Sequence, residues 1–105
     1  MIRKGSIMKL LPGMEKEYEK RHAELWPEIK EAIYGDGCTS YTIFHDPETN
    51  LLFEYLEIED EERWASRGAS EAIKRWWDYM ADIMETNPDK SPVCRKINEV
   101  FHLEK

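Results

Sequence analysis

The sequence predicts an α+β fold in which a four-stranded antiparallel sheet carries two helices on one face. Three observations support this prediction. Short apolar segments bounded by turn residues are strand-like. Two longer stretches repeat their apolar residues every three or four positions, which is typical of helices. Gly, Pro, Asn and Asp mark the junctions between these segments.

The N-terminal third begins with a strand from Ile2 to Leu10, and Pro12-Gly13 predicts the turn after it. A helical face follows that consists of Met14, Tyr18, His22, Leu25, Ile29 and Ile33. Pro27 interrupts this face. Because a proline in a helix frees the carbonyl group four residues earlier, the helix should be kinked or broken one residue beyond His22. The cluster Gly35-Asp36-Gly37 ends it.

A hairpin is predicted next. Tyr41 to Phe44 and Leu51 to Ile58 are strand-like, and the segment between them contains the turn signal Asp46-Pro47. Tyr41 and Ile43 point to one face of the first of these strands, and Phe44 points to the other.

The last third supplies the second helix and the last strand. Asp60 is a good helix N-cap, and carboxylates follow it in the first turn, where the helix dipole favours them. Gly68 interrupts this helical stretch and Ser70 can restart it, after which a long helix should run to about Met84. The segment from Ile97 to Leu103 is the expected last strand.

The resulting order, β-α-β-β-α-β, is that of the ferredoxin-like or split βαβ plan, and we expect residues 1–105 to form one domain. In this plan both helices cover one face of the sheet, and the other face is polar where it meets water. Here both faces are apolar. One parity of the segment from Leu51 to Ile58 carries Leu51, Phe53 and Tyr55, and the other carries Leu52, Leu56 and Ile58. We therefore expect the second face to pack against the sheet of a second copy, in a homodimer.

Composition narrows the class of protein. The 15 basic and 22 acidic residues give a net charge of -7, which disfavours binding to nucleic acid or to an anionic membrane. The apolar runs are far shorter than a membrane span, and the first residues do not resemble a signal peptide. Cys38 and Cys94 have neither metal-binding nor redox spacing. We expect a cytoplasmic protein with reduced thiols.

Two adjacent tryptophans, Trp76 and Trp77, lie in the second helical stretch. Consecutive helical residues point about 100° apart, so one apolar stripe does not readily cover both rings. Trp77 follows the core spacing together with Ile73, Met80 and Met84, which leaves Trp76 on the flank. Both rings belonging to the core is one interpretation, and a ligand against the flanking indole is the other.

Among the three histidines, His22 is the candidate for chemistry. His45 lies at the predicted hairpin turn and His102 near the C-terminus, so solvated side chains are expected for both. His22 lies one helical turn from Tyr18 and close to the break at Pro27. A hydrogen-bonded core histidine is the ordinary interpretation of this position, but histidine exchanges protons at neutral pH. Histidine, tyrosine hydroxyls and indole faces together suit a neutral polyol.

Several segments, in order and at nearly the same intervals, resemble the L-rhamnose mutarotase family over almost the whole chain. They are M-I-R-K at the start, E-Y-E-K-R-H-A-E-L-W-P-E around His22, N-L-L-F-E-Y-L-E-I-E-D-E-E-R-W from Asn50, R-W-W-D-Y-M, N-P-D-K-S-P-V and E-V-F-H-L. The resemblance implies a dimeric α/β barrel of ferredoxin-like subunits. It also implies an isomerase that interconverts the α and β anomers of L-rhamnose without a cofactor or metal.

The resemblance also implies roles for single residues. The family's proton-donating histidine matches His22, and its sugar-contacting residues match Tyr18, Tyr41, Trp76 and Trp77. Asp89 is an additional candidate contact. The chain departs from the family pattern at three places. Bulkier side chains are expected at Gly5-Ser6, a helix without interruption at Arg67-Gly68, and an aromatic residue such as tyrosine at His102.

The mechanism expected for such a site is acid–base catalysis. His22 would protonate the ring oxygen as the sugar ring opens, and it would reverse this role on closure. Tyr18, Tyr41 or a bound water would take the proton of the anomeric hydroxyl group. Two alternatives remain: a noncatalytic sugar-binding or regulatory module on the same dimeric barrel, and a cofactor-free oxygenase, because unrelated chemistries share this sheet plan.

Overall fold

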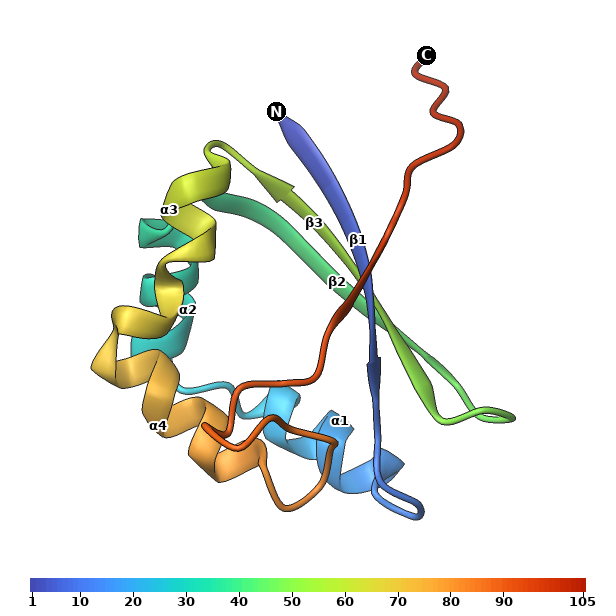
Figure 1. Cartoon of the computed structure of the whole chain (residues 1–105), viewed down its shortest axis with the longest axis vertical. Helices are drawn as coiled ribbons and strands as arrows, with labels where there is room; N and C mark the ends of the chain where they lie inside the picture. The colour runs from blue at the N-terminus through green and yellow to red at the C-terminus, as the bar shows by residue number, and fades with distance from the viewer.

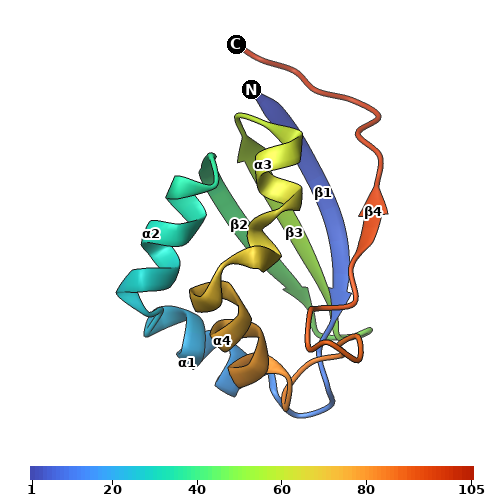
Figure 2. The same cartoon turned by 60° about the vertical axis from the view of Figure 1, so that its left-hand side comes forward.

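Four strands form one antiparallel sheet in the order β2-β3-β1-β4. The structure, a computed structural model, describes residues 1–105 apart from the side chain of Ala69. The strands are β1 (Ile2–Lys9), β2 (Cys38–Asp46), β3 (Leu51–Ile58) and β4 (Arg95–Ile97). All the helices lie on one side of this sheet (Figures 1 and 2). Sheet order and layering confirm the predicted ferredoxin-like plan. Among the described residues, no helix is both long enough and apolar enough to cross a membrane.

The first helical stretch is two helices, α1 (Glu15–Ala23) and α2 (Pro27–Gly35). The break falls where the sequence predicts it, because Trp26 is extended and Pro27 occupies the first turn of α2, a position that needs no backbone N–H. As a result His22 lies in the last turn of α1, next to the irregular segment.

The second helical stretch consists of α3 (Glu61–Ala65), η1 (Arg67–Ala69) and α4 (Glu71–Met80). Asp60 and Ser70 cap α3 and α4 through their side chains, as predicted. However, α4 ends at Met80 rather than near Met84. The chain leaves the helix there because the following residues bond to the end of β1 and the residues after it. Glu85 N donates to Lys9 O at 2.9 Å, and Leu11 N donates to Ile83 O at 2.9 Å.

The last strand is also shorter than predicted: β4 spans three residues instead of the segment from Ile97 to Leu103. It pairs with β1 between Gly5 and Ile7. A Cβ atom on Gly5 would lie 3.1 Å from a side-chain carbon of Ile97, so the glycine makes room for this strand. Beyond β4 the chain departs from the sheet edge (Figure 1), and Phe101 is 77% exposed.

The two faces of the sheet differ in cover. The inner face packs against the helices, and its apolar side chains Met8, Leu52, Leu56 and Ile58 are buried. The outer face carries the opposite parity, including Phe44 at 65% and Tyr55 at 36% exposure. Both faces are apolar, as expected from the sequence, but the helices of this chain cover only the inner one.

Candidate active site

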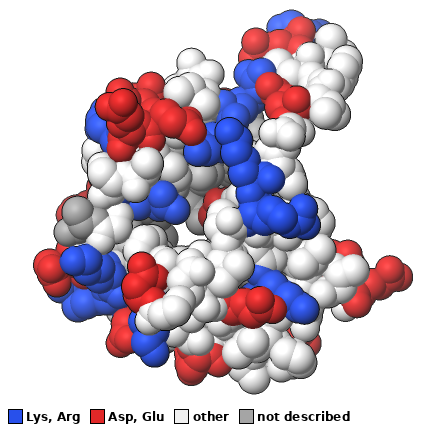
Figure 3. All heavy atoms as spheres, viewed as in Figure 1, with Lys and Arg blue, Asp and Glu red and all other residues white. Residues whose placement is uncertain are grey.

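A cavity of about 1330 Å³ lies between the inner face of the sheet and the helices. A hollow is visible near the middle of the face shown in Figure 3. The cavity is lined by all five residues predicted for the site: Tyr18, His22, Tyr41, Trp76 and Trp77. The fold therefore gathers residues of α1, β2 and α4 around one space.

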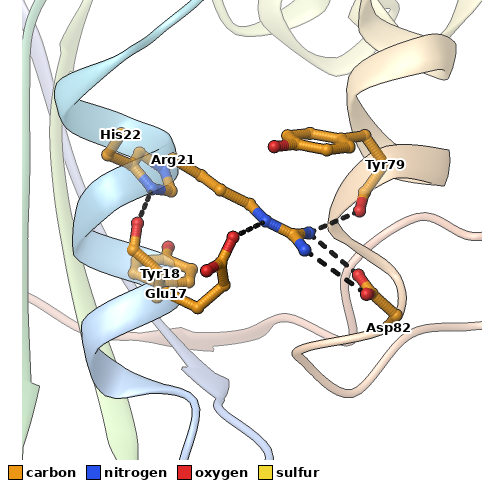
Figure 4. A network of polar contacts seen from close by, with 6 residues as sticks. All are labelled: Glu17, Tyr18, Arg21, His22, Tyr79 and Asp82. Carbon is orange, nitrogen blue, oxygen red and sulfur yellow. Dashed lines mark hydrogen bonds and ion pairs between the residues drawn. The ribbon is translucent and has the colours of Figure 1, made fainter.

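His22 is held in one orientation by the backbone of its own helix. Its Nδ1 lies 3.0 Å from the carbonyl oxygen of Tyr18 (Figure 4). Because a carbonyl oxygen only accepts, Nδ1 carries the hydrogen, and Nε2 of a neutral ring is then the proton-accepting nitrogen. Burial lowers the pKa of His22 below its usual 6.5, although the hydrogen bond to Tyr18 opposes this shift. The neutral imidazole therefore predominates at neutral pH.

Aromatic rings surround this imidazole. The Tyr18 ring centre lies 4.3 Å from that of His22, and Trp76 meets His22 edge-on at 5.5 Å. Trp26, which the sequence did not single out, packs edge-on against Trp76 at 5.1 Å. The rings of Tyr18, His22 and Trp76 thus form one wall of the cavity, and Trp26 supports this wall through its contact with Trp76.

The tryptophan pair is arranged in the opposite way to the prediction. Trp76 is only 8% exposed and belongs to the main core, whereas Trp77 is half-buried at its edge. The reason is the packing of Trp76 against Trp26, which covers the flank that helical spacing alone leaves open. Both rings nevertheless line the cavity, so packing and contact with a ligand are compatible here.

The unusual pair Arg67-Gly68 supports the Trp77 ring. A Cβ atom on Gly68 would lie 3.1 Å from a ring carbon of Trp77, so the missing side chain lets the indole approach η1. The Arg67 guanidinium lies 4.5 Å from the centre of the Trp64 ring and donates to the Trp64 carbonyl oxygen. This departure from the family pattern has a local packing role.

A network around Arg21 ties α1 to the C-terminal end of α4 (Figure 4). The guanidinium contacts Glu17 at 2.8 Å and Asp82 at 2.8 Å, and it donates to the carbonyl oxygen of Tyr79 at 2.7 Å. It also lies 4.2 Å from the centre of the Tyr79 ring. Arg21 neighbours His22, and Tyr79 lies one turn beyond Trp76, so this network links the helix that carries the histidine to the helix that carries the tryptophan. The i,i+4 spacing from Glu17 is the only part of it that the sequence indicates.

Tyr41 marks the sheet side of the cavity. Its hydroxyl group donates to the carboxylate of Glu54, which also accepts from Ser6 Oγ at 2.7 Å. Tyr41 as a whole is 38% exposed, but its hydroxyl group is bonded to the carboxylate of Glu54, a residue that is only 7% exposed. Burial and the charge of Glu54 raise the pKa of Tyr41 well above its usual value, and the same two causes raise the pKa of Tyr18. Both phenols therefore stay protonated at physiological pH.

One further expectation needs correction. His45 is not a solvated turn residue, because β2 extends to Asp46 and places His45 half-buried on the cavity wall, where Nε2 lies 3.0 Å from Asn50 Oδ1. Asp89 accepts from the backbone N–H of Ser91 at 3.0 Å, and its contact with a ligand stays a prediction. His102 is exposed, as predicted.

Comparison with known proteins shows which family this chain belongs to. Residues 3–103 match a family model for L-rhamnose mutarotase. A protein of Lachnoclostridium phytofermentans named L-rhamnose mutarotase is 57% identical over 104 residues, which cover 99% of this chain and 100% of that protein. The protein of the same name from Bacteroides thetaiotaomicron is 49% identical over 99% of this chain and 100% of its own length.

Solved structures agree with the fold. The crystal structure of an L-rhamnose mutarotase from Formosa agariphila superposes with a TM-score of 0.90 and 42% identity, covering 99% of this chain and 100% of that one. An antibiotic biosynthesis monooxygenase superposes with a TM-score of 0.62 at 14% identity, covering 95% and 99% of the two chains. The second similarity shows a shared fold alone.

Proposed function

The chain belongs to the L-rhamnose mutarotase family and is therefore an isomerase that interconverts the anomers of L-rhamnose, and we propose that His22 is its general acid–base group. One observation carries the proposal. His22 lines the cavity with Nδ1 bound to a backbone carbonyl oxygen, which leaves Nε2 as the ring nitrogen available to a sugar.

The neutral resting state of His22 suggests the order of proton transfers. Nε2 accepts the proton of the anomeric hydroxyl group, and the bond between C1 and the ring oxygen breaks to give the open aldehyde. The imidazolium so formed donates its proton to the ring oxygen. Both oxygens are attached to C1 before opening, so one nitrogen serves both, and neither tyrosine need take the proton. Rotation about the C1–C2 bond and the reverse steps then close the ring on the other face.

A single positioned acid–base group is sufficient for this reaction. Such groups contribute typically 10²–10⁴-fold in rate. Mutarotation also proceeds without a catalyst in water, so a contribution of this size gives a useful enzyme.

The remaining predicted residues would hold the sugar. We propose that Trp76 and Trp77 pack against the apolar face of the ring and its methyl group, and that Tyr18 and Tyr41 bond its hydroxyl groups. The protonated state of both phenols supports this role. Tyr18 can then both donate and accept hydrogen bonds, and Tyr41, whose hydrogen goes to Glu54, can accept them.

We further propose that residues 1–105 act as a single domain that pairs with a second copy through the outer face of the sheet, in the dimeric barrel of this family. The exposed apolar side chains Phe44 and Tyr55 support that pairing. A cytoplasmic location is the matching proposal for a sugar-metabolising enzyme whose Cys38 and Cys94 are free thiols.

Saturation-transfer NMR on equilibrated L-rhamnose tests the function. One anomeric proton is irradiated and the other observed, with catalytic amounts of the native protein, of His22→Ala and of the exposed control His102→Ala. We expect transfer with the native protein and the control, and its loss with His22→Ala while tryptophan fluorescence still reports sugar binding. Normal transfer by His22→Ala would exclude the role of His22. Binding without any transfer by the native protein would favour the noncatalytic module instead.

A further inference from the structure

We propose that Glu54 is a further sugar-binding residue, which accepts hydrogen bonds from substrate hydroxyl groups at the sheet side of the cavity. This inference deepens the proposed function, because it rests on a sugar occupying the same cavity.

The position of Glu54 is unusual for a carboxylate. It lies in β3, an internal strand of the sheet, and its parity directs it to the inner face, opposite Ser6 of β1 and Ile43 of β2. The residue is only 7% exposed and lines the cavity. Its neighbours of the same parity, Leu52 and Leu56, are core side chains. A glutamate at such a position needs polar partners, since burial of an unsatisfied charge is costly.

The protein supplies only part of what this carboxylate can accept. Oε1 accepts from Ser6 and Oε2 from Tyr41, whereas a carboxylate offers about four lone-pair sites. Glu54 is not a member of the ion pairs found within the described part of the chain. The remaining acceptor capacity therefore lies at the cavity wall, where the hydroxyl groups of a sugar would complete it.

Glu54 also determines how Tyr41 meets a ligand. The hydroxyl hydrogen of Tyr41 is donated to the carboxylate, so the phenol oxygen offers only lone pairs to the cavity. The sheet side of the cavity is thus rich in acceptors, and a ligand must present hydrogen-bond donors there. Ser6 completes this arrangement: a bulkier apolar residue at this position would remove one of the two donors that hold the carboxylate.

This arrangement predicts selectivity for sugars with a free hydroxyl group at the contacted position. A site built to bond a hydroxyl group discriminates strongly against an analogue that lacks it, because buried polar groups are then left without partners. Deoxy analogues of L-rhamnose identify the hydroxyl group concerned.

The test compares Glu54→Gln with Glu62→Gln, a control at an exposed position of α3. Hydrogen bonds to a charged group are strong enough that we expect Glu54→Gln to raise both Kd and KM for L-rhamnose at least about tenfold, with kcat changed by less than about threefold. Kd is measured by tryptophan fluorescence and KM by NMR exchange. The control should leave both unchanged.

Binding of 2-, 3- and 4-deoxy-L-rhamnose shows which sugar hydroxyl group interacts with Glu54. We expect one of these analogues to bind the native protein about tenfold more weakly than L-rhamnose does, and this discrimination to disappear in Glu54→Gln. An unchanged Kd, a loss of kcat at constant KM, or equal discrimination by native protein and variant would each overturn the inference. Thermal unfolding confirms that the variant is folded. If it is not, Glu54→Asp, which retracts the carboxylate by one methylene group, should give an intermediate loss of affinity, and native affinity in Glu54→Asp would be contrary evidence.

The binding titration also separates this inference from the proposed function. Affinity for L-rhamnose that depends on Glu54, in a protein without anomer exchange, would leave the inference standing and remove the proposed function. Exchange that depends on His22 but not on Glu54 would do the reverse.

Discussion

The two faces of the sheet have similar apolar composition but different surroundings. On the inner face Leu52 and Ile58 are 0% exposed beneath the helices. Glu54 and Tyr41 of the same face line the cavity. On the outer face Phe44 is 65% exposed. Apolar side chains on one face of a strand therefore indicate that this face will be covered. The tertiary structure shows whether the cover comes from the same chain. In this protein the candidate chemistry lies on the face that the chain covers itself.

Truncation of one apolar side chain on each face should give the largest difference in unfolding free energy between the two faces. Leu52→Ala removes a fully buried side chain and should lower the free energy of unfolding by about 2–5 kcal/mol. Phe44→Ala, measured at a protein concentration low enough for a monomer, should lower it by less than about 1 kcal/mol, since this ring is largely exposed. Urea unfolding measures both. Equal losses would mean that the outer face is as well packed as the inner one.

The Arg21 network is the next largest contribution on the inner side. Arg21→Met keeps the apolar stem but leaves Glu17, Asp82 and the Tyr79 carbonyl oxygen without their donor. We expect a loss of about 0.5–2 kcal/mol in unfolding free energy, because the guanidinium is largely shielded from water while its carboxylate partners remain in contact with water. Lys20→Met, on an exposed position of the same helix, is the control. A change within error of that control would show that the network is not stabilising.

A charge on the outer face should affect association rather than folding. Phe44→Asp places a carboxylate where the proposed second copy packs, and we expect the dimer Kd to rise at least about tenfold. Sedimentation at a series of concentrations measures it, with thermal unfolding as a check on the subunit. A native protein that remains monomeric at high concentration would remove the proposed role of this face.

The smallest effect is the pH dependence caused by His22. Since its pKa is lowered on folding, the unfolded chain binds more protons than the native one below pH 6.5. Stability should therefore decrease as the pH falls from about 6.5 toward the folded-state pKa, and level off below it. His22→Ala should weaken this decrease, and His102→Ala, at an exposed position, should not. Urea unfolding between pH 7.5 and about pH 4.5 makes the comparison; identical slopes in the native protein and in His22→Ala would contradict it.

Local signals account for what the sequence predicts correctly. The proline at the start of α2 and the caps Asp60 and Ser70 act within one or two turns, so their effects are visible in the chain itself. The five site residues could be predicted because the family resemblance covers nearly the whole chain, and the structure places all five in one cavity. The end of α4 and the short β4 were predicted wrongly because contacts with β1 decide both.

The same reasoning explains the residues that the sequence did not reveal. Glu54 occurs in a segment where acidic residues are frequent. Its parity matches that of Leu52 and Leu56, but the sequence does not show that this face opposes Ser6 and lines a cavity. The contacts of Arg21 with Tyr79 and Asp82 join residues about 60 positions apart, and no periodicity indicates them. Trp26 precedes a proline and resembles a loop residue until its ring is found against Trp76.

The bond between His22 and the Tyr18 carbonyl oxygen gives the cavity a built-in spectroscopic reporter. A ring locked in one tautomer has two distinct nitrogen-15 resonances, one from a protonated nitrogen and one from a bare nitrogen. The resonance of the bare Nε2 should move when L-rhamnose enters the cavity, whereas that of the anchored Nδ1 should change little. Occupancy of the cavity can then be followed in the unaltered protein, independently of turnover.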